Sequence, residues 1–329
     1  MSPVLISVLL PARNVCATLH EALGSILAQR DAPPFEVVCV DDASTDGTGA
    51  LLAEAARRDA RVRVVRGHGH GLVEALDLGL RECRGQLVAR MDGDDVAHPD
   101  RLRLQAQMLL DDRRLGAVGS LVECFPAPLS PGLARLQAWL NQTVTAAQCR
   151  NGRFIEAPLV HPSATFRREA LRYEDHGWAE DWDLQLRMIE QGWQLAKVPG
   201  VLLRWRDSPQ RLTRTGAAYR EKQMFRLRAH YLSRGPLQGR EFHLWGAGPT
   251  GKRLARELES HGRRPVAFFD VDRNKRVARG RPVLHRADLP PPGRSLMLCA
   301  VGADGARDEI RAMLDAARYI EGEHYLFAA

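Results

Sequence analysis

The sequence predicts an α/β protein whose first domain is built on a mostly parallel sheet and is followed by a smaller α/β domain. Short apolar runs of strand length alternate with helical patterns from the start of the chain. This alternation is typical of a parallel sheet covered by helices on both faces. Acidic clusters directly follow two of the strands, and a new strand, glycine-rich turn and helix begin after Pro236.

The expected elements follow one another in the order strand, helix, strand. Strands are expected at 4–10, 35–40, 62–65 and 86–91, and helices at 17–29, 47–58, 72–82, 182–191 and 217–233. The pattern is irregular from 121 to 166, apart from an amphipathic segment at 133–141. The motif Arg234-Gly235-Pro236 indicates a break after the last of these helices.

The length of 329 residues allows about two domains at roughly 100–200 residues each. We expect a first domain at residues 1–215, a helical connector at 216–236 and a Rossmann-like domain at 237–329. The basic helix of the connector resembles a membrane-surface helix, but its apolar residues form no clean stripe. A connecting role is therefore favoured.

Composition excludes several classes of protein. The charged fraction of 26% and the apolar fraction of 45% are ordinary for globular domains and exclude disordered chains. The net charge of +7 is shared between the two parts of the chain, so we expect no nucleic-acid partner. No apolar run reaches the ~20 residues of a membrane span. The start of the chain, Met1-Ser2-Pro3, leads into a strand pattern and lacks the features of a signal peptide.

The six cysteines form no Cys-x-x-Cys pair and accompany no histidine pair at metal-binding spacing. This distribution argues against a disulfide framework or a zinc site and favours reduced thiols. We therefore expect a cytoplasmic protein. Peripheral contact with the inner face of the membrane stays open as an alternative.

Two acidic clusters follow strands directly. One is Asp41-Asp42-Ala43-Ser44-Thr45-Asp46-Gly47-Thr48, and the other is Asp92-Gly93-Asp94-Asp95. Ligands of open parallel sheets bind at the carboxyl ends of the strands, so both clusters should face one crevice. An Asp-x-Asp arrangement suits a hard divalent cation that also binds substrate phosphates. The alternative is a solvated acidic turn that caps the next helix.

Taken together, the order and spacing of the motifs resemble the family 2 glycosyltransferases. The motifs are Ile6–Asn14, Ser25–Gln29, Asp41–Thr48, Met91–Asp95 with Pro99–Leu102, His161–Ser163, Ala179–Leu184 and Leu203–Arg206. The resemblance covers about residues 4–214. It implies a GT-A fold, a nucleotide-sugar donor and a divalent metal, Mg or Mn.

The resemblance assigns donor-binding roles to several residues. Pro11 and Arg13 line the nucleotide pocket beside Asp42, which matches the family's base-contacting aspartate. Asp92 and Asp94 match the Asp-x-Asp motif, with Asp94 the expected direct metal ligand. Arg13 replaces a more common aromatic residue, and Ala43 stands where glycine is usual. The nucleobase (uracil, thymine or guanine) therefore stays open.

Asp181 matches the aspartate of the family's Glu-Asp pair, which implies a general base and a single displacement with inversion at the anomeric carbon. Glu180 would flank it and contact the acceptor. The alternative for both is a pair of carboxylates that favour the start of a helix at 182–191.

Further positions are weaker candidates for acceptor or diphosphate contacts. His161 would border the donor diphosphate or the acceptor, or be a core histidine. Trp178 would stack on a sugar ring or pack in the core. Arg204 and Arg206 would bind the leaving diphosphate or form surface ion pairs. The loop His68-Gly69-His70-Gly71 is interpreted as donor-proximal rather than metal-binding.

The second glycine-rich loop places Gly246, Gly248 and Gly251 between a strand and a helix, and Asp270 closes the next strand. This is the context of a dinucleotide-binding fingerprint, in which the glycines approach a pyrophosphate and the acidic residue meets a ribose. NAD or another nucleotide would bind there. We rank a packing or oligomerisation role for this domain first.

The leading hypothesis is thus an inverting, metal-dependent glycosyltransferase in surface-glycan or polysaccharide synthesis. Its partners would be a nucleotide-sugar donor and a glycan or lipid-linked acceptor. One alternative is a nicotinamide-dependent oxidoreductase that uses the C-terminal glycine-rich loop. Another is a protein that senses nucleotide-sugars without turnover.

Overall fold

The computed structural model describes residues 5–329, so residue 4 of the first expected strand and the start of the chain lie outside the described residues. The described chain divides into two compact units. The first holds residues 5–149, 158–176 and 180–214, and the second holds 150–157, 177–179 and 215–329. Two short segments that the sequence analysis assigns to the first domain therefore pack with the C-terminal part of the chain.

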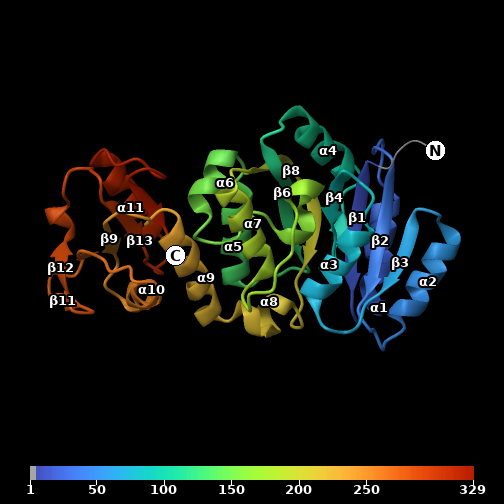
Figure 1. Ribbon diagram of the computed structural model, residues 1–329, viewed down its shortest axis with the longest axis horizontal. Coiled ribbons are helices and arrows are strands. Elements are labelled where there is room, and N and C mark those ends of the chain that lie inside the picture. The colour runs from blue at the N-terminus through green and yellow to red at the C-terminus, as the bar shows by residue number, and fades with distance from the viewer. Residues whose placement is uncertain (1–4) are drawn as a thin grey trace. The chain divides into compact units, whose positions relative to one another are not determined.

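The first unit is built on an eight-stranded mixed sheet (Figure 1). Its strands are β1 (Ile6–Ala12), β2 (Phe35–Asp41), β3 (Val62–Arg66), β4 (Leu87–Arg90), β5 (Val96–Ala97), β6 (Leu115–Phe125), β7 (Thr165–Arg167) and β8 (Gln194–Arg206). They lie in the order β3-β2-β1-β4-β7-β6-β8-β5. Strands β1 to β4 run parallel, whereas β7 is antiparallel to both of its neighbours. The carboxyl ends of β1, β2 and β4 therefore meet at one edge.

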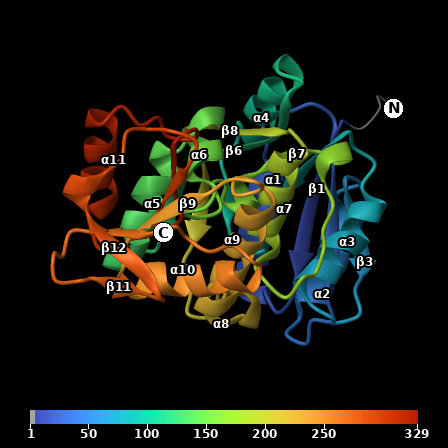
Figure 2. The same cartoon turned by 60° about the vertical axis from the view of Figure 1, so that its left-hand side comes forward.

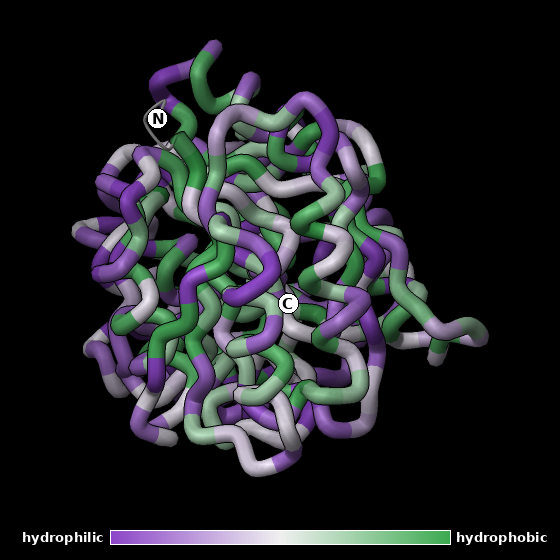
Figure 3. Tube along the Cα trace, turned by 90° about the vertical axis from the view of Figure 1, so that its right-hand side faces the viewer, coloured by the Kyte–Doolittle hydropathy of each residue, from purple (hydrophilic) through white to green (hydrophobic). Residues whose placement is uncertain are grey.

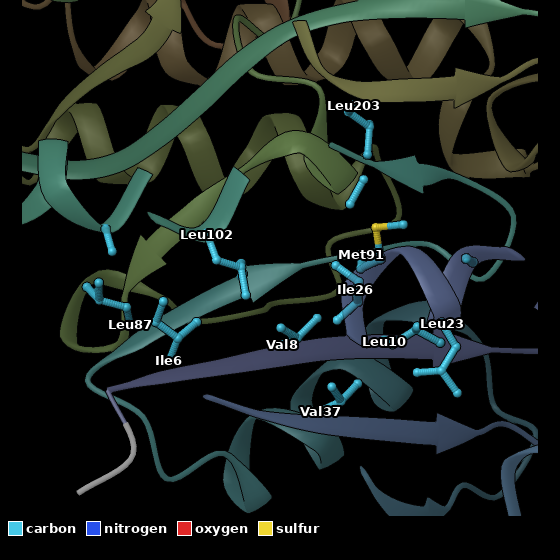
Figure 4. Packing of buried hydrophobic residues seen from close by; sticks show 14 of the residues in the cluster. Ile6, Val8, Leu10, Leu23, Ile26, Val37, Leu87, Met91, Leu102 and Leu203 are labelled. Atoms are coloured by element: carbon cyan, nitrogen blue, oxygen red, sulfur yellow. The ribbon is translucent and has the colours of Figure 1, made fainter. Parts of the chain in front are cut away.

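Helices cover both faces of this sheet. The helices along residues 5–215 are α1 (Cys16–Leu27), α2 (Thr48–Arg58), α3 (Leu72–Glu82), α4 (Arg101–Asp111), α5 (Pro131–Gln142), α6 (Ala146–Gly152), α7 (Glu180–Glu190) and α8 (Leu212–Thr215), with 3-10 turns at His161–Ser163 and Arg168–Ala170. The last of them, α8, buries none of its residues. Alternate residues of β1 point to opposite faces: Ile6, Val8 and Leu10 join one buried cluster and Leu9 joins another. Figure 4 shows the first cluster, in which β1 side chains pack with Ile26 and residues of neighbouring elements.

The middle of the chain is more regular than the sequence predicts. Strand β6 runs through residue 125, into the stretch expected to be irregular, and α5 and α6 follow it. The 13-residue strand β8 pairs along almost the whole of β6, for example Val122 with Leu203 and Cys124 with Trp205. The length of β6 is therefore set by its pairing with β8, a strand distant in the sequence. The local sequence of β6 does not reveal this pairing.

The second unit contains a six-stranded sheet. Its strands are β9 (Phe242–Trp245), β10 (Phe268–Asp270), β11 (Val277–Ala278), β12 (Arg281–His285), β13 (Leu296–Cys299) and β14 (Tyr325–Phe327), and its helices are α9 (Glu221–Arg234), α10 (Pro249–Ser260) and α11 (Ala306–Ala316), with 3-10 turns at Ala217–Tyr219 and Arg286–Asp288. Figure 2 labels three of these strands, β9, β11 and β12. The strand order is β11-β12-β10-β9-β13-β14, and only β11 is antiparallel to its neighbour. A parallel sheet that grows outward on both sides of its first strand is the arrangement of doubly wound nucleotide-binding folds.

Two segments from the first half of the chain complete this second unit. Arg228 of α9 donates hydrogen bonds from Nε to the carbonyl oxygen of Phe154 (2.9 Å) and from Nη2 to that of Ile155 (2.8 Å). The side chain of Phe154 is buried, and Ile155 packs against the core formed by β9, β10 and β13. The ring of Trp178 lies 5.3 Å from the ring of His230, measured between centroids.

All six cysteines are free thiols, and five of them are buried. Burial raises the pKa of Cys39 and Cys83 to about 12 and that of Cys124 and Cys149 to about 11. Cys16, at the first turn of α1, is partly accessible.

Hydrophilic and hydrophobic stretches alternate along the chain trace in Figure 3, as expected where helices bury only one face. Among the described residues, each helix is too short or too polar to cross a bilayer.

Candidate active site

Three carboxylates gather where β4 ends. Asp92, Asp94 and Asp95 each place one carboxylate oxygen within 4.8 Å of the others. Burial, reinforced by the charge of Asp92, raises the pKa of Asp94 to about 6. Burial and the charges of both neighbours raise the pKa of Asp95 well above its usual value. The clustered, partly desolvated oxygen ligands fit a hard divalent cation, which would offset their mutual repulsion.

Residues distant in sequence hold this acidic turn in place. The backbone N–H of Arg206 donates to Asp95 Oδ1 (2.7 Å), and Arg206 Nε donates to the carbonyl oxygen of Asp94 (2.6 Å). Thr18 of α1 donates to the carbonyl oxygen of Gly93 (2.8 Å). A Cβ on Gly93 would lie 2.8 Å from the Val15 side chain, so this close approach requires glycine.

The two arginines of β8 differ in what they contact. Arg206 supports the acidic turn and also pairs with Glu21. Arg204 is exposed, lies 3.7 Å from the carboxylate of Glu123 and covers the ring of Phe125. Arg206 and Arg204 both contact other groups of this protein. Diphosphate binding by either arginine stays a prediction.

Buried arginines fix the end of β4. Arg90, its last residue, is 3% exposed and forms an ion pair with Asp92. Arg101 of α4 is fully buried, and its Nη2 donates to the carbonyl oxygens of Arg90 (2.6 Å) and Ala164 (3.3 Å). Burial lowers the pKa of Arg101 to about 9. Sequence analysis missed a role for Arg90, although its position just before the Asp-x-Asp motif was a usable signal.

The expected nucleotide-binding residues lie together at the ends of β1 and β2. Asp42 is 4% exposed, and its two oxygens accept hydrogen bonds from the N–H groups of Gly69 (2.7 Å) and Gly71 (3.1 Å). Arg13 Nη1 lies 3.4 Å from Asp42 Oδ2 and donates to the carbonyl oxygen of Gly69 (3.1 Å). Pro11 is buried on β1, opposite Val40. The loop of residues 68–71 is therefore attached directly to Asp42.

The first turn of α1 connects the turn that follows β2 to the acidic turn. The N–H of Val15 donates to Thr48 Oγ1 (2.9 Å), and that of Cys16 donates to Asp46 Oδ2 (3.0 Å). Thr18 in the same turn reaches Gly93 of the acidic turn. The turns that follow β2 and β4 are thus both hydrogen-bonded to one short segment at the start of α1.

The expected catalytic pair begins helix α7. Asp181 is partly exposed, and its Oδ1 accepts the N–H of Trp182 (2.8 Å). Glu180 is 6% exposed, and its Oε1 lies 3.9 Å from Nδ1 of buried His161. Nε2 of His161 lies 3.0 Å from the hydroxyl of Tyr173. Burial, together with the charge of Arg90, lowers the pKa of His161 well below its usual value, so this imidazole is neutral.

Electrostatic interactions join α7 to the acidic turn. The charges of Asp92 and Glu180 both favour protonated Arg90 and, despite its burial, raise its pKa. Burial raises the pKa of the Tyr173 hydroxyl. The positive charge of Arg90 opposes this rise, whereas the negative charge of Asp181 adds to it. Trp178 belongs to the second unit, where its recorded ring contact is with His230, so its sugar-stacking role stays a prediction.

In the second unit the glycine-rich loop is packed tightly against its own sheet. A Cβ on Gly246 would lie 2.5 Å from the carbonyl oxygen of Ala300, and a Cβ on Gly251 would lie 1.8 Å from that of Gly246. Gly248 precedes α10 and has open space around it.

The carboxylate of Asp270 is already engaged by its own unit. Its Oδ2 accepts hydrogen bonds from the Ala247 N–H and from Lys275 Nζ, both at 2.9 Å, and Oδ1 accepts the Asp272 N–H at 3.0 Å. Nucleotide binding by Gly246, Gly248, Gly251 and Asp270 stays a prediction.

Comparisons with known proteins agree with this geometry. The sequence profile described as Glycosyl transferase family 2 matches residues 7–173. The amylovoran biosynthesis glycosyltransferase AmsE of Erwinia amylovora is 29% identical over 181 residues, which are 53% of this chain and 66% of AmsE. In this and two further relatives, the alignment covers 66%, 26% and 65% of the relative's length, so the chain spans less than two thirds of each.

Solved structures share the fold. TarS 1-349 of S. aureus, in complex with UDP-GlcNAc, matches with a TM-score of 0.57 and 20% identity, covering 78% of this chain and 72% of that one. The mannosyltransferase PcManGT from Pyrobaculum calidifontis, in complex with GDP-Man and Mn2+, matches with a TM-score of 0.51 and 24% identity over 71% and 64% of the two chains. The expected GT-A fold is confirmed.

Proposed function

The chain belongs to glycosyl transferase family 2, and from this premise we propose that it transfers a sugar from a nucleotide-sugar donor to an acceptor hydroxyl. The observation that carries the proposal is the cluster of Asp92, Asp94 and Asp95 within the matched region, at the carboxyl end of β4. The name of the relative AmsE assigns it to amylovoran biosynthesis, which supports polysaccharide or surface-glycan synthesis as the setting. The acceptor would be a glycan or a lipid-linked saccharide.

The donor would bind across the ends of β1, β2 and β4. Pro11, Arg13 and Asp42 would hold the nucleoside, since they lie together beside the loop of residues 68–71. Asp94, with Asp92 beside it, would hold Mg or Mn, whose positive charge would offset the charge that develops on the departing diphosphate. Support comes from the three carboxylates and from two solved relatives in fold, one holding UDP-GlcNAc and one GDP-Man with Mn2+.

Asp181 would act as the general base that removes the proton of the attacking hydroxyl. Three features support this role: the carboxylate is partly exposed, it lies at the amino end of α7, and its neighbour Glu180 is buried against neutral His161. Attack on the face opposite the diphosphate in one displacement would invert the anomeric carbon. Glu180 would orient the acceptor.

The oxidoreductase and nucleotide-sensing alternatives are not carried forward. The matched family concerns sugar transfer, and the carboxylate of Asp270 accepts three hydrogen bonds within its own unit. We propose that the C-terminal unit serves packing or assembly.

A thermal-shift screen of UDP-, GDP- and dTDP-sugars, each with and without Mn2+ or Mg2+, tests the proposed function. We expect at least one nucleotide-sugar to raise the unfolding temperature only with the metal and to be turned over in a nucleotide-release assay with glycan acceptors. Stabilisation by NAD alone, with no metal-dependent effect of any nucleotide-sugar, would contradict the proposal.

A further inference from the structure

A polar hollow of about 310 Å³ lies in the second unit, where α9 and α10 end. Six residues line it, and the side chain of each carries a hydrogen-bond donor: His230, Ser233, Arg234, Gln238, His261 and Arg263. Within the described part of the chain, no aspartate or glutamate lines this hollow. Small-molecule sites have volumes of about 300–1,000 Å³. The hollow therefore has the size of a small-molecule site, and its lining favours an anion.

Ser233 is the buried member of this lining. It is 7% exposed, whereas Arg234, Gln238 and His261 are exposed. Within residues 5–329, the Oγ of Ser233 has no hydrogen-bond partner. Buried hydroxyl groups in proteins are almost always hydrogen-bonded to protein, water or a ligand. An acceptor bound in the hollow would supply the missing partner.

Contacts between the lining residues gather the basic side chains around the serine. Arg263 Nη2 donates to the carbonyl oxygen of Ser233 (3.2 Å), which places this guanidinium beside the serine. Arg234 Nη1 lies 3.2 Å from Nε2 of His230. The rings of His230 and His261 lie 6.0 Å apart, measured between centroids. Basic groups from α9 and from the segment after α10 thus form the walls of one hollow.

Basic side chains near the end of a helix often cap its last carbonyl groups, but here backbone groups bond to such carbonyls in both helices. At the end of α9, the N–H of Leu237 donates to the carbonyl oxygen of Leu232 (2.9 Å). At the end of α10, the N–H of Arg263 donates to the carbonyl oxygen of Leu258 (3.0 Å). Each helix end adds roughly half a negative charge, against a full positive charge on each of the two lining arginines. The lining therefore stays positively charged.

We propose that this hollow binds a phosphate group, either free phosphate or the phosphate of a small soluble molecule. The hollow lies outside residues 7–173, the region that matches the transferase family, so the inference adds ligand binding to the packing or assembly role of this unit. A phosphate group presents at least three strong acceptor oxygens, which can meet a hydroxyl, a guanidinium and an imidazole on different walls at once. Hydrogen bonds from arginine to phosphate are among the strong ones.

Isothermal titration calorimetry on the metal-free full chain tests the proposal. Inorganic phosphate and glucose 6-phosphate are titrated separately, with glucose and with sodium chloride at matched ionic strength as blanks. We expect saturable binding of at least one of the two phosphates and no binding of glucose. The tighter of the two phosphates shows whether the ligand is free phosphate or a phosphorylated molecule.

Ser233→Ala removes the unpartnered hydroxyl and should weaken phosphate binding at least about tenfold, because a hydrogen bond to a charged group is lost. Its unfolding temperature without phosphate should stay the same or rise. The control Ser260→Ala removes a hydroxyl that donates to the carbonyl oxygen of Glu257 (2.7 Å), outside the hollow, and should keep wild-type affinity. Arg234→Gln should also weaken binding at least about tenfold, whereas Arg256→Gln, at an exposed position of α10, should not.

Three results would overturn the proposal. One is the absence of saturable binding of either phosphate beyond the salt blank. Another is equal affinity in Ser233→Ala and Ser260→Ala; if Ser233→Ala does not fold, equal affinity in Arg234→Gln and Arg256→Gln decides in its place. The third is loss of phosphate binding in Asp94→Ala, which would place the anion at the acidic turn. The titration needs no donor turnover, so failure of the proposed sugar transfer would leave its result unchanged.

Discussion

The carboxylates of the site are held by quite different partners. Asp42 accepts two backbone N–H groups from the loop of residues 68–71, and Asp95 accepts one from β8. Asp94 has the repulsion of Asp92 beside it and a pKa raised to about 6, first of all by burial. Hydrogen bonds from backbone N–H groups fix the orientation of a carboxylate, so that it can orient a neutral ligand. A carboxylate that is repelled by neighbouring acidic groups is instead stabilised by binding a cation.

Asp94→Ala should abolish the metal-dependent part of donor stabilisation. The substitution removes an oxygen ligand, and it also relieves repulsion within the acidic turn, so the protein without metal should unfold at the same temperature or higher. Thermal shifts with a nucleotide-sugar, with and without Mn2+, measure both effects. Asp77→Ala, which removes an exposed carboxylate paired with Arg81, is the matched control. If donor stabilisation in Asp94→Ala depended on Mn2+ as it does in wild type, Asp94 would not be a metal ligand.

Asp181→Asn should lower turnover by about 10²–10⁴-fold, the usual contribution of a general base. The amide oxygen can still accept the N–H of Trp182, so the start of α7 should be preserved. Donor affinity should therefore stay within a few-fold of wild type. Steady-state nucleotide release and donor titration check the two halves of this expectation, and near-wild-type turnover would exclude Asp181 as the base.

At the scale of elements, β8 carries a buried amine into the contact with α5. Lys197 is 1% exposed, and its Nζ donates to the carbonyl oxygen of Leu140 in α5. Burial lowers its pKa from 10.5 to about 8. The charged amine therefore destabilises the fold at neutral pH, while its hydrogen bond holds the end of the helix.

This depressed pKa predicts a pH dependence of stability. Between about pH 8 and 10.5 the unfolded chain keeps on this amine a proton that the folded chain has lost, so the contribution of Lys197 to the free energy of unfolding should rise with pH across this window. A shift from 10.5 to about 8 corresponds to roughly 3 kcal/mol. The raised pKa values of the buried cysteines lower the free energy of unfolding above about pH 9 in every variant, so the lysine is measured as a difference. In urea unfolding from pH 7 to 10, the free energy of unfolding of wild type and of the exposed-lysine control Lys222→Met should rise relative to that of Lys197→Met. Parallel curves for all three would contradict the assignment.

The elements also show how far sequence reasoning reaches. Strands β1 to β4 and helices α1 to α3 were predictable because each is a short apolar run or a periodic segment bounded by turns. The Asp-x-Asp turn and the Glu-Asp pair were found because motif spacing is itself a sequence property. The length of β6 and the ion pair of buried Arg90 with Asp92 were not, since one depends on pairing with β8 and the other on burial that the sequence does not reveal.

At the scale of the whole molecule, the two units interleave along the chain. Residues 150–157 and 177–179 pack with residues 215–329 rather than with their sequence neighbours. A cut at a single position therefore cannot separate the units. Ile155 in particular is part of the core that β9, β10 and β13 complete.

A chain truncated at residue 236 should be less stable than the full chain. It keeps Ile155 and Phe154 but loses the sheet against which Ile155 packs, so apolar surface becomes exposed. We expect a lower unfolding temperature and stronger binding of a hydrophobic dye, and Ile155→Gln in the truncated chain should reduce the dye signal. A truncated chain with the stability and dye binding of the full protein would show that the segment is independent of the C-terminal sheet.

The burial of five of the six thiols leaves Cys16 as the accessible one, at the turn that joins the segment after β2 to the acidic turn. A maleimide fluorophore added to the unmodified protein would therefore attach next to the proposed donor site without mutagenesis. Its emission would report occupancy directly, so that donors of unknown identity could be screened by titration before any acceptor is known.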